Sequence, residues 1–279
     1  MQIVREIEVL KSYLKDKKNS GKSVGFVPTM GALHNGHAEL VKYSKNECDI
    51  TVCSIFVNPT QFNNQEDLDK YPRMETEDFH FLDVLGCDVV FIPSVDEMYN
   101  SNCTLKFSFG NLETTMEGAF RPGHFNGVAL IVSKLFNVVQ PDRAYFGQKD
   151  LQQLAVIRRL VSDLSFQLDI VGVPTVREES GLAMSSRNKR LSEKALLRAS
   201  QINKSLESIE DEILKGVSFD KLKSIQLRNL SNYNIQVEYL ELVDSDTLEK
   251  IENKNGNNSV AVCIAAIVDG VRLIDNRIF

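Results

Sequence analysis

The sequence lacks any apolar run long enough to cross a membrane. Its longest one, at 260–268, has nine residues, about half of the ~20 that a transmembrane helix needs. Charged side chains, among them Arg5, Glu6 and Lys11, interrupt the first residues, so the apolar core of a secretory signal peptide is also missing. The sequence therefore predicts a cytoplasmic protein with no membrane partner.

Cysteine is scarce, and its spacing suggests no pairs. The five cysteines are Cys48, Cys53, Cys87, Cys103 and Cys263, and no two of them form a C-x-x-C pair. An odd number of widely spaced thiols fits free cysteines in a reducing compartment better than a disulfide framework.

Positive charge is also in short supply. The chain has 32 lysines and arginines against 38 acidic residues, which gives a formal net charge of −6. A general nucleic-acid binder needs basic surface to displace counterions, so no nucleic-acid partner is expected. The negative net charge is still compatible with binding one small anion in a locally basic cleft. The length of 279 residues is enough for one or two domains.

Among the features that are present, residues 24–37 (VGFVPTMGALHNGH) are the most informative. The apolar start predicts a buried strand that breaks at Pro28, and a helical pattern begins at Ala38. A glycine-bearing loop between a strand and a helix offers free backbone N–H groups and the positive end of the helix dipole. Such a loop suits phosphate oxygens, and it carries His34 and His37.

Three interpretations of this histidine pair are open from the residues. Each ring could be an ordinary structural or surface histidine. Zinc would need further ligands, and the other histidines are only His80 and His124, with no cysteine pair nearby. The third is a nucleotide site, because a His-x-Gly-His sequence after a strand resembles the signature of the nucleotidyltransferase superfamily. The flanking PTMGAL letters strengthen that resemblance.

The first part of the chain alternates strands and helices. Strands are predicted at 24–27, 50–57, 88–93, 105–109, 143–146 and 167–174, and helices at 2–18, 38–46, 75–85, 126–138 and 151–164. This alternation predicts an α/β fold with a Rossmann-like, doubly wound parallel sheet over residues 1–175.

A smaller α+β domain is predicted over residues 176–279. Its helices are expected at 192–215 and 219–230, and its strands at 235–243, 260–268 and 271–274, with a loop at 253–258. No parallel crossover is forced there, so antiparallel pairing is expected.

Polar residues follow one of the buried strands of the first part. Asn58 and Gln61 come after 50–57, at the strand end where α/β proteins bind ligands, although an Asn-Pro turn alone would also explain them. The loop at 117–125 holds two glycines, Arg121 and His124. It is either a mobile surface loop or a flap over a cleft.

Two further segments carry positive charge. Lys149 and Asp150 lie at the start of a predicted helix. They could form a solvated ion pair and a helix cap, or they could face a bound phosphate. Gln153 follows one turn later. A small polar loop at 184–188 carries Arg187. Two imidazoles, an ammonium and a guanidinium suit a nucleoside triphosphate that is attacked at its α-phosphate.

The chain resembles the pantothenate synthetase family over nearly its whole length. The matching blocks are PTMGALHNGH at 28–37, FVNPTQF at 56–62, YPR at 71–73, RPGHFNGV at 121–128, KLFN at 134–137, QPD at 140–142, FGQKDLQQ at 146–153 and SSRN at 185–188. The resemblance implies ATP-dependent ligation of (R)-pantoate and β-alanine to pantothenate through a pantoyl adenylate, with release of AMP and pyrophosphate. It also implies a homodimer.

The resemblance assigns roles residue by residue. His37 would be the catalytic proton donor, assisted by His34, Lys149 and Arg187. Pantoate would bind Gln61, Gln153 and Asn58, and Gln61 would also contact β-alanine. Mg²⁺ would enter with the ATP phosphates, with Asp78 as an aid to that ion. The implied ATP-binding residues are Met30, Gly31, Ala32, Leu33, His34, Asn35, Gly36, His37, Gly147, Gln148, Lys149, Asp150, Val176, Met184, Ser185, Ser186 and Arg187.

Three other functions compete with this one. A nucleotidyltransferase that adenylylates or cytidylylates a phosphate ester would share the histidine motif. It would need basic residues for the acceptor phosphate, whereas Asn58, Gln61 and Gln153 are neutral. A non-catalytic nucleotide-binding protein is disfavoured by the presence of His37, Lys149 and Arg187. A dinucleotide oxidoreductase is disfavoured because no G-x-G-x-x-G follows the first strand.

Overall fold

The computed structural model describes residues 1–99, 103–254, 256 and 258–279. The chain divides into two compact units. The first comprises Met1–Gln148 and Val156–Pro174, and the second comprises Lys149–Ala155 and Thr175–Phe279. The loop expected at 253–258 includes residues 255 and 257, which lie outside the described part.

The first unit is built on a six-stranded sheet in which every pairing is parallel. The strands are β1 (Gln2–Val4), β2 (Val24–Thr29), β3 (Ile50–Ile55), β4 (Val89–Phe91), β5 (Arg143–Gly147) and β6 (Asp169–Val173), in the order β1-β4-β3-β2-β5-β6. The predicted Rossmann-like parallel sheet is confirmed. The chain winds outward from β2 in one direction and then from β5 in the other. Ligands of such sheets bind at this switch point, beyond the carboxyl ends of the strands.

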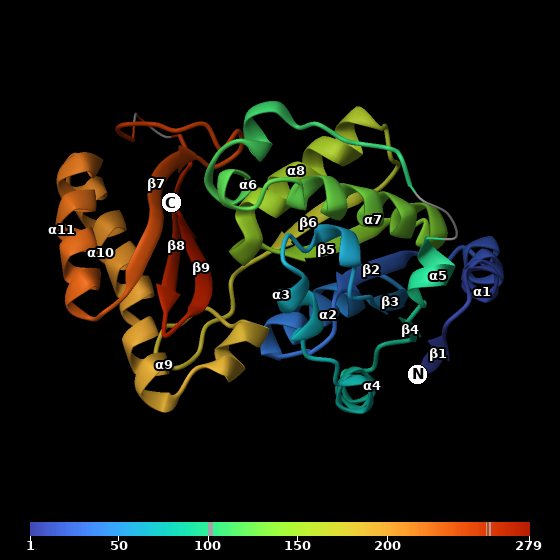
Figure 1. Cartoon of the computed structure of the whole chain (residues 1–279). Coiled ribbons are helices and arrows are strands. Elements are labelled where there is room, and N and C mark those ends of the chain that lie inside the picture. The colour runs from blue at the N-terminus through green and yellow to red at the C-terminus, as the bar shows by residue number, and fades with distance from the viewer. Residues whose placement is uncertain (100–102, 255, 257) are drawn as a thin grey trace. The chain divides into compact units, whose positions relative to one another are not determined.

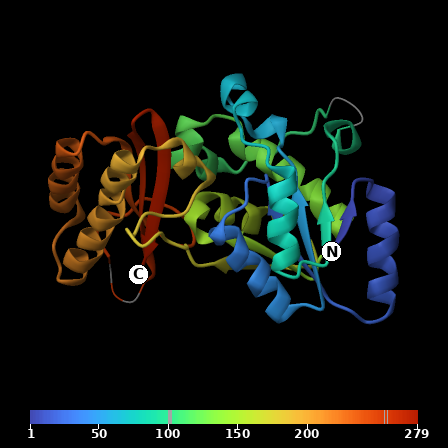
Figure 2. The ribbon, with the colours of Figure 1, turned by 90° about the horizontal axis from the view of Figure 1, so that it is seen from below.

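Helices cover both faces of this sheet. Figure 1 shows α7 on one side of the strands and α2 and α4 on the other, and Figure 2, seen from below, brings α2 and α4 in front of the strands. All six residues of β3 are buried, as expected for a strand covered on both faces. The helical elements are α1 (Ile7–Asn19), α2 (Asn35–Glu47), η1 (Pro59–Gln61), α3 (Gln65–Asp69), α4 (Glu75–Val84), α5 (Val95–Met98), η2 (Gly110–Glu113), α6 (Met116–Phe120), α7 (His124–Val139), η3 (Gln148–Asp150) and α8 (Leu151–Asp163).

The second unit packs helices on a three-stranded antiparallel sheet, ordered β7-β8-β9, which confirms the pairing expected from the sequence. Its core joins apolar side chains of α10 and α11 to those of the strands. The elements are η4 (Ser186–Arg190), α9 (Glu193–Ala199), α10 (Gln201–Leu214), α11 (Phe219–Asn232), β7 (Gln236–Asp244), β8 (Val260–Val268) and β9 (Val271–Ile278).

Several sequence-based element predictions were wrong. Strand β2 continues through Pro28 to Thr29 instead of breaking at Pro28. The loop expected at 117–125 includes residues of α6 and the start of α7. Residues 2–4 form strand β1 rather than the start of a helix, because they pair with β4. Residues 105–109 have no strand assignment, and the Phe107 N–H donates to Asn126 Oδ1 at 2.7 Å instead of to a ladder. The long helix expected at 192–215 is interrupted at Ser200, whose hydroxyl donates back to the Leu197 carbonyl at 2.8 Å.

Among the described residues, every helix is too short or too polar to cross a membrane.

Candidate active site

The loop after β2 makes a tight left-handed turn at the switch point of the sheet. Gly31 and Ala32 have φ angles of 79° and 50°. A non-glycine residue at positive φ costs on the order of 1 kcal/mol, so other contacts must hold this turn. One of them is Thr29, whose hydroxyl accepts the Gly31 N–H at 3.2 Å and donates to the Ser54 carbonyl at 2.7 Å.

Asp78 of α4 is the main anchor of this loop. Asp78 is 3% exposed, and its two carboxylate oxygens accept the N–H groups of Ala32 and Leu33 at 2.9 and 2.7 Å. A Cβ at Gly31 would lie 2.9 Å from Asp78 Oδ2, so the glycine is needed for this close approach. Charge-assisted bonds of this kind are about twice as strong as neutral ones. Asp78 thus sets the backbone of the candidate nucleotide loop, and its role toward Mg²⁺ stays a prediction.

The two histidines of the motif form a capping box at the N-terminus of α2. His34 is the N-cap residue, and its Nδ1 accepts the Gly36 N–H at 3.1 Å. The Nδ1 of His37 accepts the His34 N–H at 3.3 Å. A neutral imidazole whose Nδ1 accepts carries its proton on Nε2. Both rings therefore present an Nε2–H donor at a helix N-terminus, where a phosphate is favoured.

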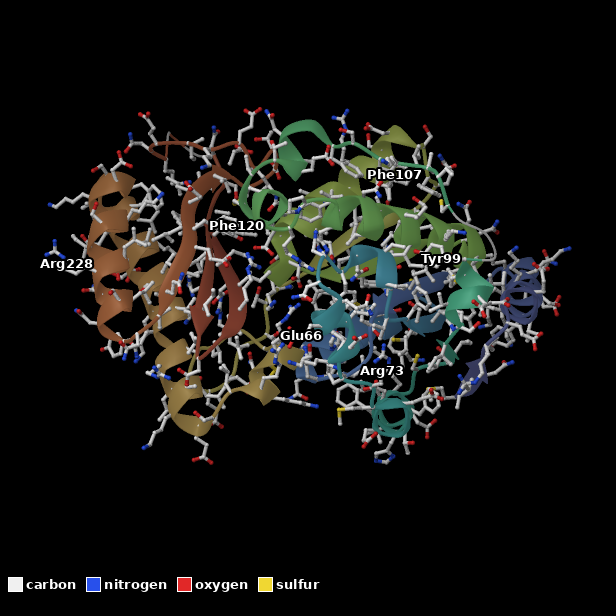
Figure 3. All side chains as sticks on the ribbon, in the orientation of Figure 1. Glu66, Arg73, Tyr99, Phe107, Phe120 and Arg228 are labelled. Atoms are coloured by element: carbon white, nitrogen blue, oxygen red, sulfur yellow. The ribbon has the colours of Figure 1, made fainter. Side chains whose placement is uncertain are left out.

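The side-chain nitrogen and oxygen of Asn58 are both hydrogen-bonded within the first unit. It is 1% exposed. Its Nδ2 donates to Gln61 Oε1 and to the Gly127 carbonyl, both at 3.1 Å. Its Oδ1 accepts from Thr60 and, at 2.8 Å, from the hydroxyl of Tyr99, which is labelled in Figure 3. Burial raises the pKa of the Tyr99 phenol, so the phenol keeps its donor proton.

Gln61 is oriented by these contacts. Because Asn58 donates to Oε1, the Gln61 amide group directs its Nε2 toward Met30, and the Nε2–Sδ distance is 2.8 Å. Met30 begins the loop that leads to the histidines. The first unit therefore joins a neutral amide site to the histidine loop through the Gln61–Met30 contact.

The second unit carries the predicted cations. Lys149 lies in η3, its ammonium is 3.7 Å from Asp150 Oδ1, and its side chain is 17% exposed. The Lys149 carbonyl accepts from Asn276 Nδ2 at 2.8 Å, which ties this turn to β9. Gly147 and Gln148 immediately precede Lys149, at the end of β5 and the start of η3. Gln153 is half-buried in the first turn of α8.

A second loop of this unit gathers the remaining predicted ATP-binding residues. The Met184 N–H donates to the Val176 carbonyl at 3.0 Å, which closes a short hairpin. Ser185 then caps η4, because its Oγ accepts the Arg187 N–H at 3.2 Å. Ser186 and Arg187 are the first two residues of η4.

A partly buried ion pair holds this hairpin on β9. The guanidinium of Arg177 donates to both carboxylate oxygens of Asp275, at 2.7 and 3.0 Å, and also to the Gly181 carbonyl at 3.1 Å. The side chains of the pair are 20% and 2% exposed. Bidentate pairing of this kind fixes orientation as well as charge.

Several contacts at the candidate site were not foreseen from the sequence. The sequence analysis did not single out Tyr99, Arg177 or Asp275, and it assigned Asp78 to a metal rather than to the loop backbone. The partners are 41 residues apart for Tyr99–Asn58, 46 for Asp78–Ala32 and 98 for Arg177–Asp275. No local pattern signals contacts over such separations.

Comparisons with protein families and with curated sequences point to the same family. A family model described as pantoate-beta-alanine ligase matches residues 2–278. The pantothenate synthetase of Cytophaga hutchinsonii is 50% identical over 277 residues, which cover 99% of this chain and 98% of that protein. The pantothenate synthetase of Bacteroides fragilis is 50% identical over 276 residues, with the same coverage of 99% and 98%.

Solved structures agree with the sequence comparison. The pantothenate synthetase from Thermus thermophilus is 40% identical, with a TM-score of 0.91 and coverage of 99% of both chains. The pantoate-beta-alanine ligase from Francisella tularensis, described as complexed with beta-gamma ATP and beta-alanine, is 36% identical. Its TM-score is 0.82, with coverage of 99% of this chain and 97% of that one.

Proposed function

The chain belongs to the pantoate–β-alanine ligase family, and we propose that it joins (R)-pantoate to β-alanine with ATP through a pantoyl adenylate. It is thus an amide-forming ligase. In the first proposed step a pantoate carboxylate oxygen attacks the α-phosphorus, and the bond to the departing pyrophosphate breaks. In the second step the β-alanine nitrogen attacks the acyl carbon and AMP leaves. The products are pantothenate, AMP and pyrophosphate.

The observation that carries this proposal is the capping box of His34 and His37. Because both Nδ1 atoms bind backbone N–H groups, both rings carry an Nε2–H donor at the start of α2. Donors fixed before the reaction stabilise charge that develops on phosphate oxygens without reorganising. His37 is the residue we assign to the departing pyrophosphate or an α-phosphate oxygen, with His34 beside it.

The neutral surroundings of Gln61 support a carboxylate acceptor. An amide binds the hydroxyls and the carboxylate of pantoate without placing a competing charge beside the nucleophile. Asn58 has its polar atoms bound within the protein, so we propose that it orients Gln61 rather than contacting pantoate itself. Gln153 is the second pantoate residue in the proposal.

The second unit supplies Lys149 and Arg187 for the β- and γ-phosphates in this proposal. Their role rests on the family membership, and so does a homodimer. We also propose a division into domains 1–175 and 176–279, in which the smaller domain acts as a lid, and a cytoplasmic location. A lid would serve to keep water from the acyl adenylate, which hydrolyses readily.

Mg²⁺ is proposed to come with the triphosphate. The described residues include no group of three or more His, Cys, Asp or Glu side chains that could hold a metal ion. Both oxygens of Asp78 bind backbone N–H groups. In this proposal ATP oxygens hold the ion, where it would neutralise phosphate charge.

The test is ATP–pyrophosphate isotope exchange with pantoate present and β-alanine absent. Exchange that requires pantoate supports a reversible pantoyl adenylate, and AMP formation on adding β-alanine completes the assignment. Absence of exchange, together with no AMP when both acceptors are present, overturns the proposal in favour of a phosphate-ester nucleotidyltransferase or a non-catalytic protein.

A further inference from the structure

A buried histidine lies beside Gln61, outside the motif of the nucleotide loop. His124 is the first residue of α7 and is 6% exposed. Its Nδ1 lies 2.8 Å from the Gln61 carbonyl oxygen, and its Nε2 lies 3.1 Å from Arg121 Nη1. The Arg121 guanidinium also lies 3.9 Å from the buried carboxylate of Glu117.

The chemistry of arginine decides which nitrogen of His124 carries the proton. A guanidinium has only donors and does not lose its proton in proteins, so Nε2 must accept from Arg121. A neutral imidazole that accepts at Nε2 has its proton on Nδ1, and that N–H donates to the Gln61 carbonyl. His124 therefore has the tautomer opposite to that of His34 and His37.

Gln61 is held from both of its ends by this arrangement. Its amide side chain is oriented by Asn58, and its backbone carbonyl is held by His124. An imidazolium at position 124 would set an N–H against the N–H of Arg121, so the contact requires a neutral ring. The geometry couples the end of α6 and the start of α7 to the candidate acceptor site.

We propose that His124 and Arg121 are positioning residues for Gln61. Arg121 keeps the His124 ring neutral with Nε2 as an acceptor, and the Nδ1–H fixes the Gln61 carbonyl, so that the Gln61 amide meets the acceptor carboxylate in one orientation. The expected effect on the KM for pantoate rests on the proposed pantoate ligation. The tautomer can be measured without substrate.

The first measurement is the ring ¹⁵N spectrum of the full-length protein, which has four histidines. The His124 signal, assigned by its loss in His124→Asn, should be that of a neutral ring with the proton on Nδ1. In Arg121→Met the Nδ1–H still donates to the Gln61 carbonyl while Nε2 loses its donor, so the ring should take a second proton at Nε2 and show the imidazolium signal at a higher pH than in the unaltered protein. An Nε2–H or cationic ring in the unaltered protein, or no change in Arg121→Met, overturns the role of Arg121.

The second measurement compares two substitutions of one residue. The amide nitrogen of Asn can take the place of Nδ1–H, whereas Leu fills similar volume without a donor. His124→Leu should raise the KM for pantoate by about tenfold, the effect expected for one unsatisfied buried carbonyl. His124→Asn should stay within about threefold of the unaltered enzyme, and the KM for ATP should change little in both.

Equal effects of Leu and Asn, or equal changes in the KM values for pantoate and ATP, contradict a positioning role. His80→Asn, an exposed site on α4, is the matched control and should leave both KM values unchanged. If His124→Leu does not fold, the Arg121→Met spectrum and the His124→Asn kinetics still decide. Lack of pantoate-dependent exchange in the unaltered enzyme would overturn the substrate assignment and leave the tautomer result standing.

Discussion

At the scale of single residues, the histidine pair shows how one side chain serves both fold and chemistry. His34 and His37 use their Nδ1 atoms to accept backbone N–H groups of the α2 terminus. A Ser-x-x-Glu capping box would satisfy the same groups. Imidazoles do so and each keeps an Nε2–H donor, whereas an ionised glutamate in place of His37 would have none.

His37→Ala tests the assigned role of that donor. We expect kcat for adenylate formation to fall by about 100-fold or more, as for loss of a positioned acid. The dissociation constant for ATP should change by less than about fivefold, because the donor matters most when charge develops. Single-turnover kinetics and ATP titration measure the two quantities. His80→Ala is the control, and equal losses in rate and ATP binding would contradict a transition-state role.

Asp78→Asn tests the anchor of the nucleotide loop. The amide would replace one acceptor by an NH₂ group that faces a backbone N–H of Ala32 or Leu33. We expect the free energy of unfolding to fall by about 1–3 kcal/mol, as for an unsatisfied buried group. Denaturant unfolding measures it. The exposed Asp83 on the same helix provides the control Asp83→Asn. Unchanged stability of Asp78→Asn would mean that the loop does not depend on this anchor.

At the scale of elements, the contact between α7 and η1 depends on one glycine. Gly127 lies in α7, and a Cβ at this position would be 2.3 Å from the Thr60 carbonyl oxygen. The Gly127 carbonyl also accepts from Asn58. The absence of a side chain lets the helix approach the turn that carries Gln61.

Gly127→Ala should separate these two elements. We expect a loss of about 1–3 kcal/mol in unfolding free energy, because the backbone must shift. The KM for pantoate should rise, since Gln61 follows Thr60. Ser133→Ala on α7 is the matched control, because the hydroxyl of Ser133 is buried with no partner among the described residues. If Gly127→Ala proved as stable as Ser133→Ala, the close approach would not limit packing.

At the scale of the whole molecule, the free thiols differ in their access to solvent. Cys103 is exposed, whereas Cys53, Cys87 and Cys263 are buried. Burial raises the pKa of the Cys87 thiol to about 12, so only about one molecule in ten thousand carries the reactive thiolate at pH 8. The buried thiols therefore react only when their unit opens.

Thiol labelling at pH 8 should modify Cys103 rapidly and Cys87 only on unfolding. Mass spectrometry of the labelled peptides measures the order, and Cys103→Ser should remove the fast phase. Labelling of Cys53 and Cys87 in the first unit, and of Cys263 in the second, should then follow denaturant unfolding of each unit. Fast labelling of Cys87 in the native protein would contradict the burial of its thiol.

Local periodicity carried much of the fold prediction. Continuous apolar runs predicted strands such as β3 and β8, and the alternation of strands and helices predicted the parallel sheet. The same reasoning failed at β1, because the spacing of Ile3, Ile7 and Leu10 also fits a helix. Residues 2–4 form a strand because they pair with β4. At Ser200, a hydrogen bond to the preceding turn interrupts an otherwise continuous helical pattern.

The sequence by itself determined the fold class, the family and the position of the histidine loop, because these depend on hydrophobic period and on residues adjacent in the chain. The tertiary structure alone decided the orientation of the candidate site. Three contacts join segments that are 41 to 63 residues apart: Asp78 with the backbone of Ala32, Tyr99 with Asn58, and His124 with Gln61. Hydrogen-bond partners over such distances follow from how the sheet and helices pack. For that reason the ring nitrogen that carries each histidine proton can be read only from the folded protein.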